Sequence, residues 1–483
     1  MVFSSELFLF YFLPAVLVIY YFIHPKLKNV CLALASFIFY AWSGLEYAII
    51  ILISTAVNFA IGRFIGEKTH KNPLYQKQIL IIGVIFNLAL IGYFKYFNFF
   101  AENIENAIKV FNPGFSLRAP IIPLPIGISF FTFQILSYVI DVYRGTVKPQ
   151  KNIINLALYN MMFPQLIAGP IVRYADVAGQ ITERRHTIDK THLSIRRFII
   201  GLCKKVILAD GLGKVADNIF GASGNVTTGA AWFGVFCYAF QIYYDFSGYS
   251  DMAIGLGKLL GFDFNENFIY PYISKSIREF WRRWHISLST WFRDYLYIPL
   301  GGNKKSLSRT YLNLLIVFFI TGLWHGAGWN FVVWGLFHGV FLVLERGPFG
   351  RFLDKIPSIF ARIYTMFIVL VGWVFFRSEA LGAAGGYMAR MFMPWQAAQN
   401  TPQNANIFNF VELETIFIFC ICLLFSVPIA KYIKDGWAKI TNKIPALLFP
   451  VTLIADTGYI ALLFVCVLYI AGSTFSPFIY FRF

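Results

Sequence analysis

The residues best suited to chemistry in this chain are two histidines within a long uncharged stretch. Residues 311–344 contain no Asp, Glu, Lys or Arg, yet they hold His325 and His338. An ionisable group in an apolar segment is costly and usually faces the protein interior or a cavity. Imidazole also exchanges protons near neutral pH, as acid–base catalysis requires. Each histidine therefore has two interpretations, a catalytic base or a structural residue hydrogen-bonded inside the core.

The residues around the two histidines differ. His325 follows Trp324 and lies between Gly322 and Gly326, and flanking glycines let the backbone and a substrate approach closely. This favours the catalytic interpretation for His325. His338 would face another direction on the same straight helix. The structural interpretation is therefore favoured for His338, which stays a candidate for substrate binding, as does Trp324.

A second group of candidates lies in residues 274–297. Apolar residues recur there at steps of three and four, which predicts one amphipathic helix. A basic stripe containing His285 occupies the opposite face. The stripe can bind lipid phosphates from the membrane interface or the phosphates of a donor substrate, which arginine binds in a bidentate manner. We expect His285 to belong to the site, and the candidate donor-binding or substrate-binding residues here are Arg282, Arg283, Trp284, Ser289, Arg293 and Asp294.

The third group is the heptapeptide at residues 245–251, where an apolar run ends. Asp245 and Ser247 can orient a base or bind a cation, and Ser247 or Asp251 can equally cap the following helix. The six cysteines show no metal-binding spacing, and the chain has no phosphate-binding P-loop and no Gly-x-Ser-x-Gly elbow. We therefore expect neither a bound metal nor a bound cofactor.

Composition indicates the elements that position these residues. Apolar residues make up 58% of the chain and charged residues only 13%, against about a quarter in soluble domains. This excludes a soluble globular or disordered protein and predicts an all-α polytopic membrane protein, one domain over residues 1–483 with ten to twelve crossings. Basic cytoplasmic loops account for most of the net charge of +17. Because basic residues follow the first apolar run, at Leu7–Ile23, we expect the N-terminus outside the cytoplasm.

Several apolar stretches do not fit a straight span. Residues 30–61 are too long for one crossing and predict a hairpin interrupted at residues 43–46. Two prolines break Phe163–Pro170, which predicts a re-entrant element. Residues 311–344 must bend, and their glycines provide places to do so. Residues 121–140 and 417–433 are each expected to form one span, and residues 174–209 to include an interfacial helix.

The sequence resembles the membrane-bound O-acyltransferase family, and more narrowly its members that O-acetylate bacterial alginate. The stretches that carry the resemblance are Met1–Ser5, Leu124–Phe131, Phe163–Pro170, Asp245–Asp251, Tyr272–Tyr297, Gly322–Ala327 and Pro477–Phe481. The resemblance covers nearly the whole chain. The two histidine motifs at their separation are its most specific part.

The resemblance implies a helical fold with re-entrant and interfacial helices, in which funnels from the two membrane faces meet near the centre. It implies that His325 matches the family's catalytic histidine, and that His285 matches a second position where relatives have histidine or asparagine. It also implies acetyl-CoA as the donor, the bacterial inner membrane as the location, and an exported SGNH-like acetyltransferase and other polysaccharide-modification proteins as partners. Membrane lipids surround the chain, and no nucleic acid is expected.

Two other functions stay open at the level of sequence. A transporter or flippase for a glycan or lipid-linked sugar would share the broken helices, the buried polar residues and the basic inner face. A member of the same family acting on peptidoglycan or teichoic acid would share the histidine motifs. Acyl transfer predicts consumption of an acyl donor, whereas transport predicts movement of a substrate without it.

Overall fold

The computed structural model describes residues 1–66, 72–222, 226–393, 406–472 and 478–479, with the side chain of residue 409 left out. Contacts divide the chain into two compact units, Met1–Ile195 with Ala253–Asn265, and Arg196–Met252 with Glu266–Arg482. The division falls within α10 (Ile188–Cys203) and α12 (Thr228–Leu259). The described residues form helices, turns and loops without a strand, which confirms the all-α class. Of the C-terminal motif Pro477–Phe481, only Phe478 and Ile479 lie within the described residues.

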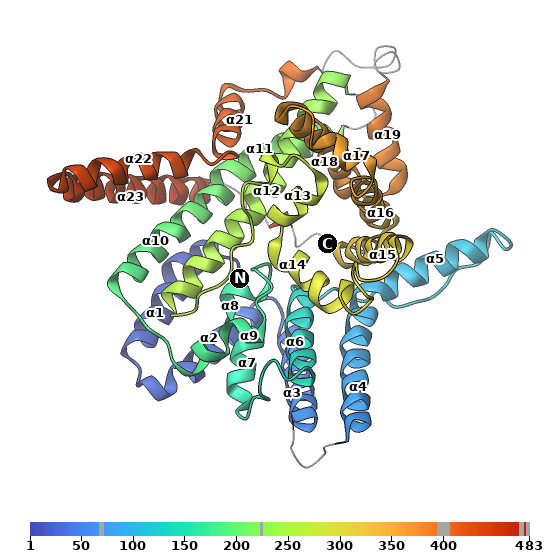
Figure 1. The fold of residues 1–483 in the computed structure, drawn as a ribbon, viewed down its shortest axis with the longest axis horizontal. Coiled ribbons are helices and arrows are strands. Elements are labelled where there is room, and N and C mark those ends of the chain that lie inside the picture. Colours follow the sequence, from blue (N-terminus) through green and yellow to red (C-terminus); the bar gives the residue numbers. More distant parts are fainter. Residues whose placement is uncertain (67–71, 223–225, 394–405, 473–477, 480–483) are drawn as a thin grey trace. The chain divides into compact units, whose positions relative to one another are not determined.

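The first unit is built from α1 to α9 and parts of α10 and α12. Helices α3, α4 and α6 contact one another and run side by side (Figure 1). The bounds of its helices are α1 (Leu13–Phe22), α2 (Lys28–Ala41), α3 (Leu45–Gly66), α4 (Pro73–Ile91), α5 (Phe97–Lys109), α6 (Ile128–Tyr143), α7 (Ile153–Met161), α8 (Phe163–Leu166) and α9 (Tyr174–Thr182). The break between α2 and α3 confirms the hairpin predicted for residues 30–61.

The second unit holds every histidine singled out from the sequence. Helix α16 contacts α13, α15 and α18. The bounds of its remaining helices are α11 (Asp210–Gly221), α13 (Ile277–Arg283), α14 (Ile286–Phe292), α15 (Leu307–His325), α16 (Trp329–Leu344), α17 (Pro348–Leu353), α18 (Ser358–Arg377), α19 (Leu381–Phe392), α21 (Leu413–Phe425), α22 (Ile429–Lys443) and α23 (Leu448–Gly472).

Length and hydropathy identify the helices that can cross a membrane. Among the described residues, five helices are long and apolar enough to cross a membrane, or six if α21 and α22 together form one span. Three shorter apolar helices accompany them. The chain is therefore a multi-pass membrane protein. The figure of ten to twelve crossings stays a prediction.

Two of the expected spans do not form the single straight helices that the sequence predicts. Residues 121–140 are helical only from Ile128, because prolines precede it and Gly127 takes a left-handed φ of 76° against the backbone of Leu166 and Ile167. Residues 417–433 bend by 64° between α21 and α22, where Pro428 removes a helical N–H. The Phe163–Pro170 segment is broken as predicted, with four residues of α8 inside a buried stretch. Its re-entrant character stays a prediction.

Residues 311–344 bend as the sequence predicts, with α15 ending at His325 and α16 beginning at Trp329. Two glycines bring these helices into backbone contact. A Cβ atom at Gly322 would lie 2.3 Å from the carbonyl oxygen of Phe331, and one at Gly335 would lie 2.2 Å from that of Phe318. The crossing therefore has no space for a side chain at either glycine.

We expect Gly335→Ala to destabilise the second unit by about 1–3 kcal/mol, because the new methyl group meets backbone that cannot rotate away. Thermal unfolding of the purified protein in detergent measures the loss. Gly386→Ala on α19 is the control, since its Cβ meets open space among the described residues and alanine favours a helix by up to about 1 kcal/mol. Equal melting temperatures for the two variants would contradict the tight crossing.

Candidate active site

His325 is the last residue of α15 and is 4% exposed. Three aromatic side chains surround its ring, with centroids 5.0 Å away for Trp324, 5.0 Å for Trp334 and 5.1 Å for Phe376. All three contacts are close to perpendicular. The imidazole is thus fixed at the point where the α15–α16 hairpin turns.

The other two histidines join this cluster through tryptophans. The ring centroid of His338 lies 5.3 Å from that of Trp334 and 5.1 Å from that of Trp281. The ring centroids of His285 and Trp324 lie 6.0 Å apart. His285 and His338 are each 1% exposed. Four predicted site residues, His285, Trp324, His325 and His338, therefore form one continuous aromatic cluster.

The single amphipathic helix predicted for residues 274–297 is wrong. Helix α13 ends at Arg283, Trp284 is extended, and α14 begins after His285, which has a left-handed backbone at φ 44° and ψ 55°. A left-handed backbone costs a non-glycine residue about 1–2 kcal/mol, so packing around it must hold it. Because the helix breaks there, His285 does not share a helical face with the arginines. Its ring instead packs on Phe246 of α12 at 4.6 Å.

The basic residues of this region have local partners. Arg283 pairs with Glu279 at 2.8 Å, and Arg293 pairs with Asp294 at 2.6 Å. Arg282 and Arg293 are exposed, and Ser289 is half-buried on α14. Trp284 packs in the core against Phe268 and Trp373. The structure therefore brings Trp284 to the aromatic cluster, because Phe268 also contacts His285 and Trp373 contacts Trp334. Arg283 and Arg293 instead pair with acidic neighbours on their own segment.

Asp245 is occupied by contacts within the second unit. Its Oδ1 lies 2.8 Å from Nζ of Lys205, and its Oδ2 accepts the backbone N–H of Ile479 at 2.7 Å. The Lys205 ammonium also pairs with Asp210 at 2.7 Å. Asp245 thus joins α12 to the C-terminal segment, and Ser247 is buried two residues later. The expected role of both residues in substrate binding stays a prediction.

Sequence reasoning missed several residues that shape the site. Glu345, at the end of α16, accepts the backbone N–H groups of Ile277 and Arg278 at 2.7 and 2.9 Å, and so caps the start of α13. Asn267 contacts His285 and Ser287. Trp334 lies in the same motif as His338 and could have been found from it. No local pattern marks Asn267 or Glu345.

Comparisons with known proteins identify the family of the chain. Residues 148–379, which include all three histidines, match the model of the membrane-bound O-acyltransferase family. A probable alginate O-acetylase AlgI of Pseudomonas putida is 43% identical, with both chains covered over their full length. The chain belongs to the membrane-bound O-acyltransferase family. It is therefore an acyltransferase, a class that uses an acyl donor as substrate.

Two further relatives have names that describe related activities. A probable alginate O-acetylase AlgI of Pseudomonas aeruginosa is 45% identical over 83% of this chain and 76% of its own length. A peptidoglycan O-acetyltransferase of Helicobacter pylori is 36% identical over 80% of this chain and 78% of its own. The names of these three relatives describe O-acetylation, of alginate in two cases and of peptidoglycan in the third. Within the described residues, no group of three or more His, Cys, Asp or Glu side chains could hold a metal ion.

Proposed function

We propose that this acyltransferase passes an acetyl group from cytoplasmic acetyl-CoA across the bacterial inner membrane for O-acetylation of an exported polysaccharide such as alginate. The observation that carries the proposal is the buried His325, held at a helix break and linked through Trp324 to His285. The alginate O-acetylases named above support the acetyl group and the polysaccharide.

The chemistry needs one base and one stabilising group. His325 removes the proton from the acceptor hydroxyl, whose oxygen attacks the thioester carbonyl. The C–S bond then breaks, the new ester C–O bond forms, and CoA leaves as the thiol after taking up a proton. His285 orients the donor or stabilises the developing oxyanion. If His325 carries the acetyl group covalently, its nitrogen makes the first attack instead.

The charges and apolar segments suggest how the substrates reach the site. The exposed Arg282 and Arg293 are suited to the phosphates of CoA on the cytoplasmic side. The acetyl group leaves on the outer side, where an SGNH-like acetyltransferase and other polysaccharide-modification proteins complete the transfer. With the N-terminus outside, the basic residues that follow the first apolar run stay in the cytoplasm. Residues 1–483 then act as one membrane domain.

Acetyl transfer is tested with the purified protein in vesicles supplied with radiolabelled acetyl-CoA on one side. We expect release of free CoA thiol that increases when the SGNH-like partner and mannuronate oligosaccharides are supplied together on the other side, with label recovered as an alkali-sensitive ester. Propionyl-CoA and free acetate are the matched donor controls, and both should react more slowly. Movement of labelled oligosaccharide across the vesicle without thiol release would contradict acyl transfer and support the transporter.

A further inference from the structure

Asn267 contacts the helix break at His285 and the first residues of α14. Asn267 is 1% exposed, and its Oδ1 lies 3.2 Å from Nδ1 of His285. The same oxygen accepts the backbone N–H of Ser287 at 3.2 Å and the Ser287 hydroxyl at 2.9 Å. The backbone oxygen of Asn267 accepts the N–H of Ile286 at 3.0 Å. One residue thus replaces hydrogen bonds that the broken helix lacks.

These contacts define the proton position on the imidazole. A backbone N–H can only donate, so the amide atom that faces Ser287 must be the carbonyl oxygen of Asn267. That oxygen also faces Nδ1 of His285, which must then carry the proton. The amide nitrogen of Asn267 points the other way and donates to Oγ of Ser250 at 3.0 Å. The neutral ring of His285 therefore has Nε2 as its acceptor nitrogen.

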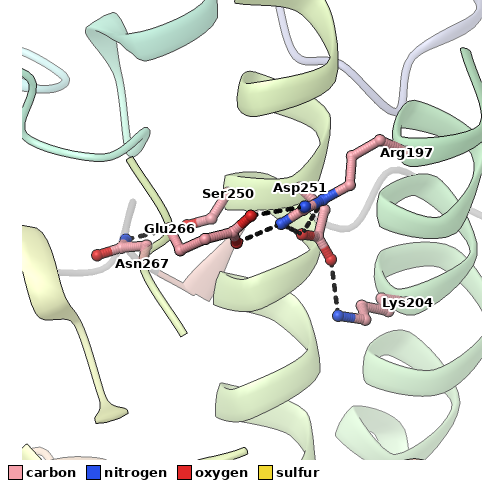
Figure 2. A network of polar contacts seen from close by, with 6 residues as sticks. All are labelled: Arg197, Lys204, Ser250, Asp251, Glu266 and Asn267. Carbon is pink, nitrogen blue, oxygen red and sulfur yellow. Dashed lines mark hydrogen bonds and ion pairs between the residues drawn. The ribbon is translucent and has the colours of Figure 1, made fainter. Parts of the chain in front are cut away.

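A charged network anchors the loop that carries Asn267 (Figure 2). The neighbouring Glu266 forms a bidentate pair with Arg197, at 2.8 and 2.6 Å. Arg197 also pairs with Asp251 at 2.6 Å, and Lys204 holds the other oxygen of Asp251 at 2.7 Å. Burial raises the pKa of Asp251, but Lys204 and Arg197 outweigh it and hold the pKa below its usual range. The network therefore stays charged at working pH and fixes the loop against α12.

We propose that Asn267 is a positioning residue that holds His285 in the Nδ1–H tautomer. Nε2 is then an acceptor, which suits His285 to orient an N–H or O–H group of a substrate and does not suit it to stabilise an oxyanion. The role assigned to Nε2 rests on the proposed function. The contact itself is independent of the substrate. Asn267 acts through His285 and does not touch the reacting atoms.

Two substitutions separate positioning from packing. Asn267→Ala removes the acceptor, and we expect kcat to fall about 10- to 100-fold, as when other groups that orient a functional imidazole are lost. Asn267→Asp keeps an acceptor for Nδ1–H and Ser287, so it should retain much more activity than Asn267→Ala. It also places a negative charge beside His285. Because aspartate fills nearly the same space as asparagine, the rescue by itself fits packing as well, and the pH profile separates the two roles.

The pH profile of Asn267→Asp provides the second readout. Burial lowers the pKa of His285 to about 3, and an adjacent carboxylate favours the imidazolium, so the pKa rises by about 1–3 units. Activity that needs the neutral ring is lost as the pH falls through that raised pKa. The acid limb of the kcat profile should therefore move to higher pH than in the wild type.

The other titratable groups near His285 leave this readout interpretable. Those on the elements packed against it include Asp245 and Asp251 of α12, Glu266 in the loop and His325 of α15. The three carboxylates have the cationic partners described above. His325 is joined to His285 through Trp324, so the added carboxylate acts more strongly on the adjacent His285 than on His325.

The matched control is Asn265→Ala, two residues earlier in the same loop, where the exposed amide contacts Asp176. We expect wild-type kcat and pH profile for this variant. The proposal is overturned if Asn267→Ala keeps kcat within twofold of wild type, or if Asn267→Asp shows the wild-type profile. His285→Ala separates failure of the proposed role of His285 from failure of the positioning role of Asn267. If it is as active as wild type, the proposed role of His285 fails, whereas inactive His285→Ala with active Asn267→Ala removes only the positioning role.

Discussion

His325→Ala is expected to lower acetyl transfer by about 10²- to 10⁴-fold, the contribution of a positioned general base. The ring is 4% exposed and lies against Trp324, Trp334 and Phe376, so no water can easily take its place as base. His325→Gln fills most of the space and keeps a hydrogen-bonding group, but it cannot take up a proton. It should therefore be almost as inactive as His325→Ala. Release of CoA thiol by purified protein measures both variants.

The control for this series is His24→Ala, because His24 is an exposed histidine far from the aromatic cluster in sequence. It should retain the wild-type rate. His338→Gln tests the structural interpretation of the third histidine, and a loss of less than about tenfold would indicate packing rather than proton transfer. Wild-type turnover by His325→Ala with an unchanged melting temperature would show that the base lies elsewhere.

Lys205→Met is expected to destabilise the protein by about 3–5 kcal/mol, because it leaves a buried carboxylate without its cation. Lys205 and Asp245 have side chains that are 2% and 3% exposed. The double variant Lys205→Met with Asp245→Asn removes both charges, and the new amide can still accept the N–H of Ile479. It should recover most of the stability, as measured by thermal unfolding in detergent.

The double variant also tests whether Asp245 binds a substrate. If Asp245 serves only to hold the C-terminal segment, the double variant should be stable and active. If it also contacts the donor or acceptor, the double variant should be stable with a raised KM or a lowered kcat. A double variant as unstable as Lys205→Met alone would contradict the ion-pair explanation.

The sequence was sufficient for the features that depend on composition and local chain geometry. Low charge predicted the membrane class, and the glycines near His325 predicted where residues 311–344 bend. Gly322 and Gly335 are needed because the backbones of α15 and α16 are in contact at these two positions. The bend and the exceptional position of His325 could therefore be deduced together.

The break at His285 could not be deduced from local pattern. Residues 274–297 have the apolar spacing of one helix, and neither proline nor glycine interrupts them. The interruption is stabilised by groups distant in sequence, the amide of Asn267 and the carboxylate of Glu345 at the start of α13. Tertiary hydrogen bonds thus override the helical preference of the segment. A single sequence carries no record of such partners.

The left-handed backbone of His285 also limits which residues can replace it during evolution. Glycine accepts this conformation most readily, and asparagine, aspartate and histidine adopt it more often than other residues, whereas β-branched side chains rarely do. Asparagine can therefore substitute for histidine without moving the loop or the following helix. Valine or isoleucine would require the chain to be rebuilt there. Backbone geometry thus restricts the residue types at this position before any selection for catalysis. The permitted types include histidine and asparagine, the two that the family resemblance implies for the position.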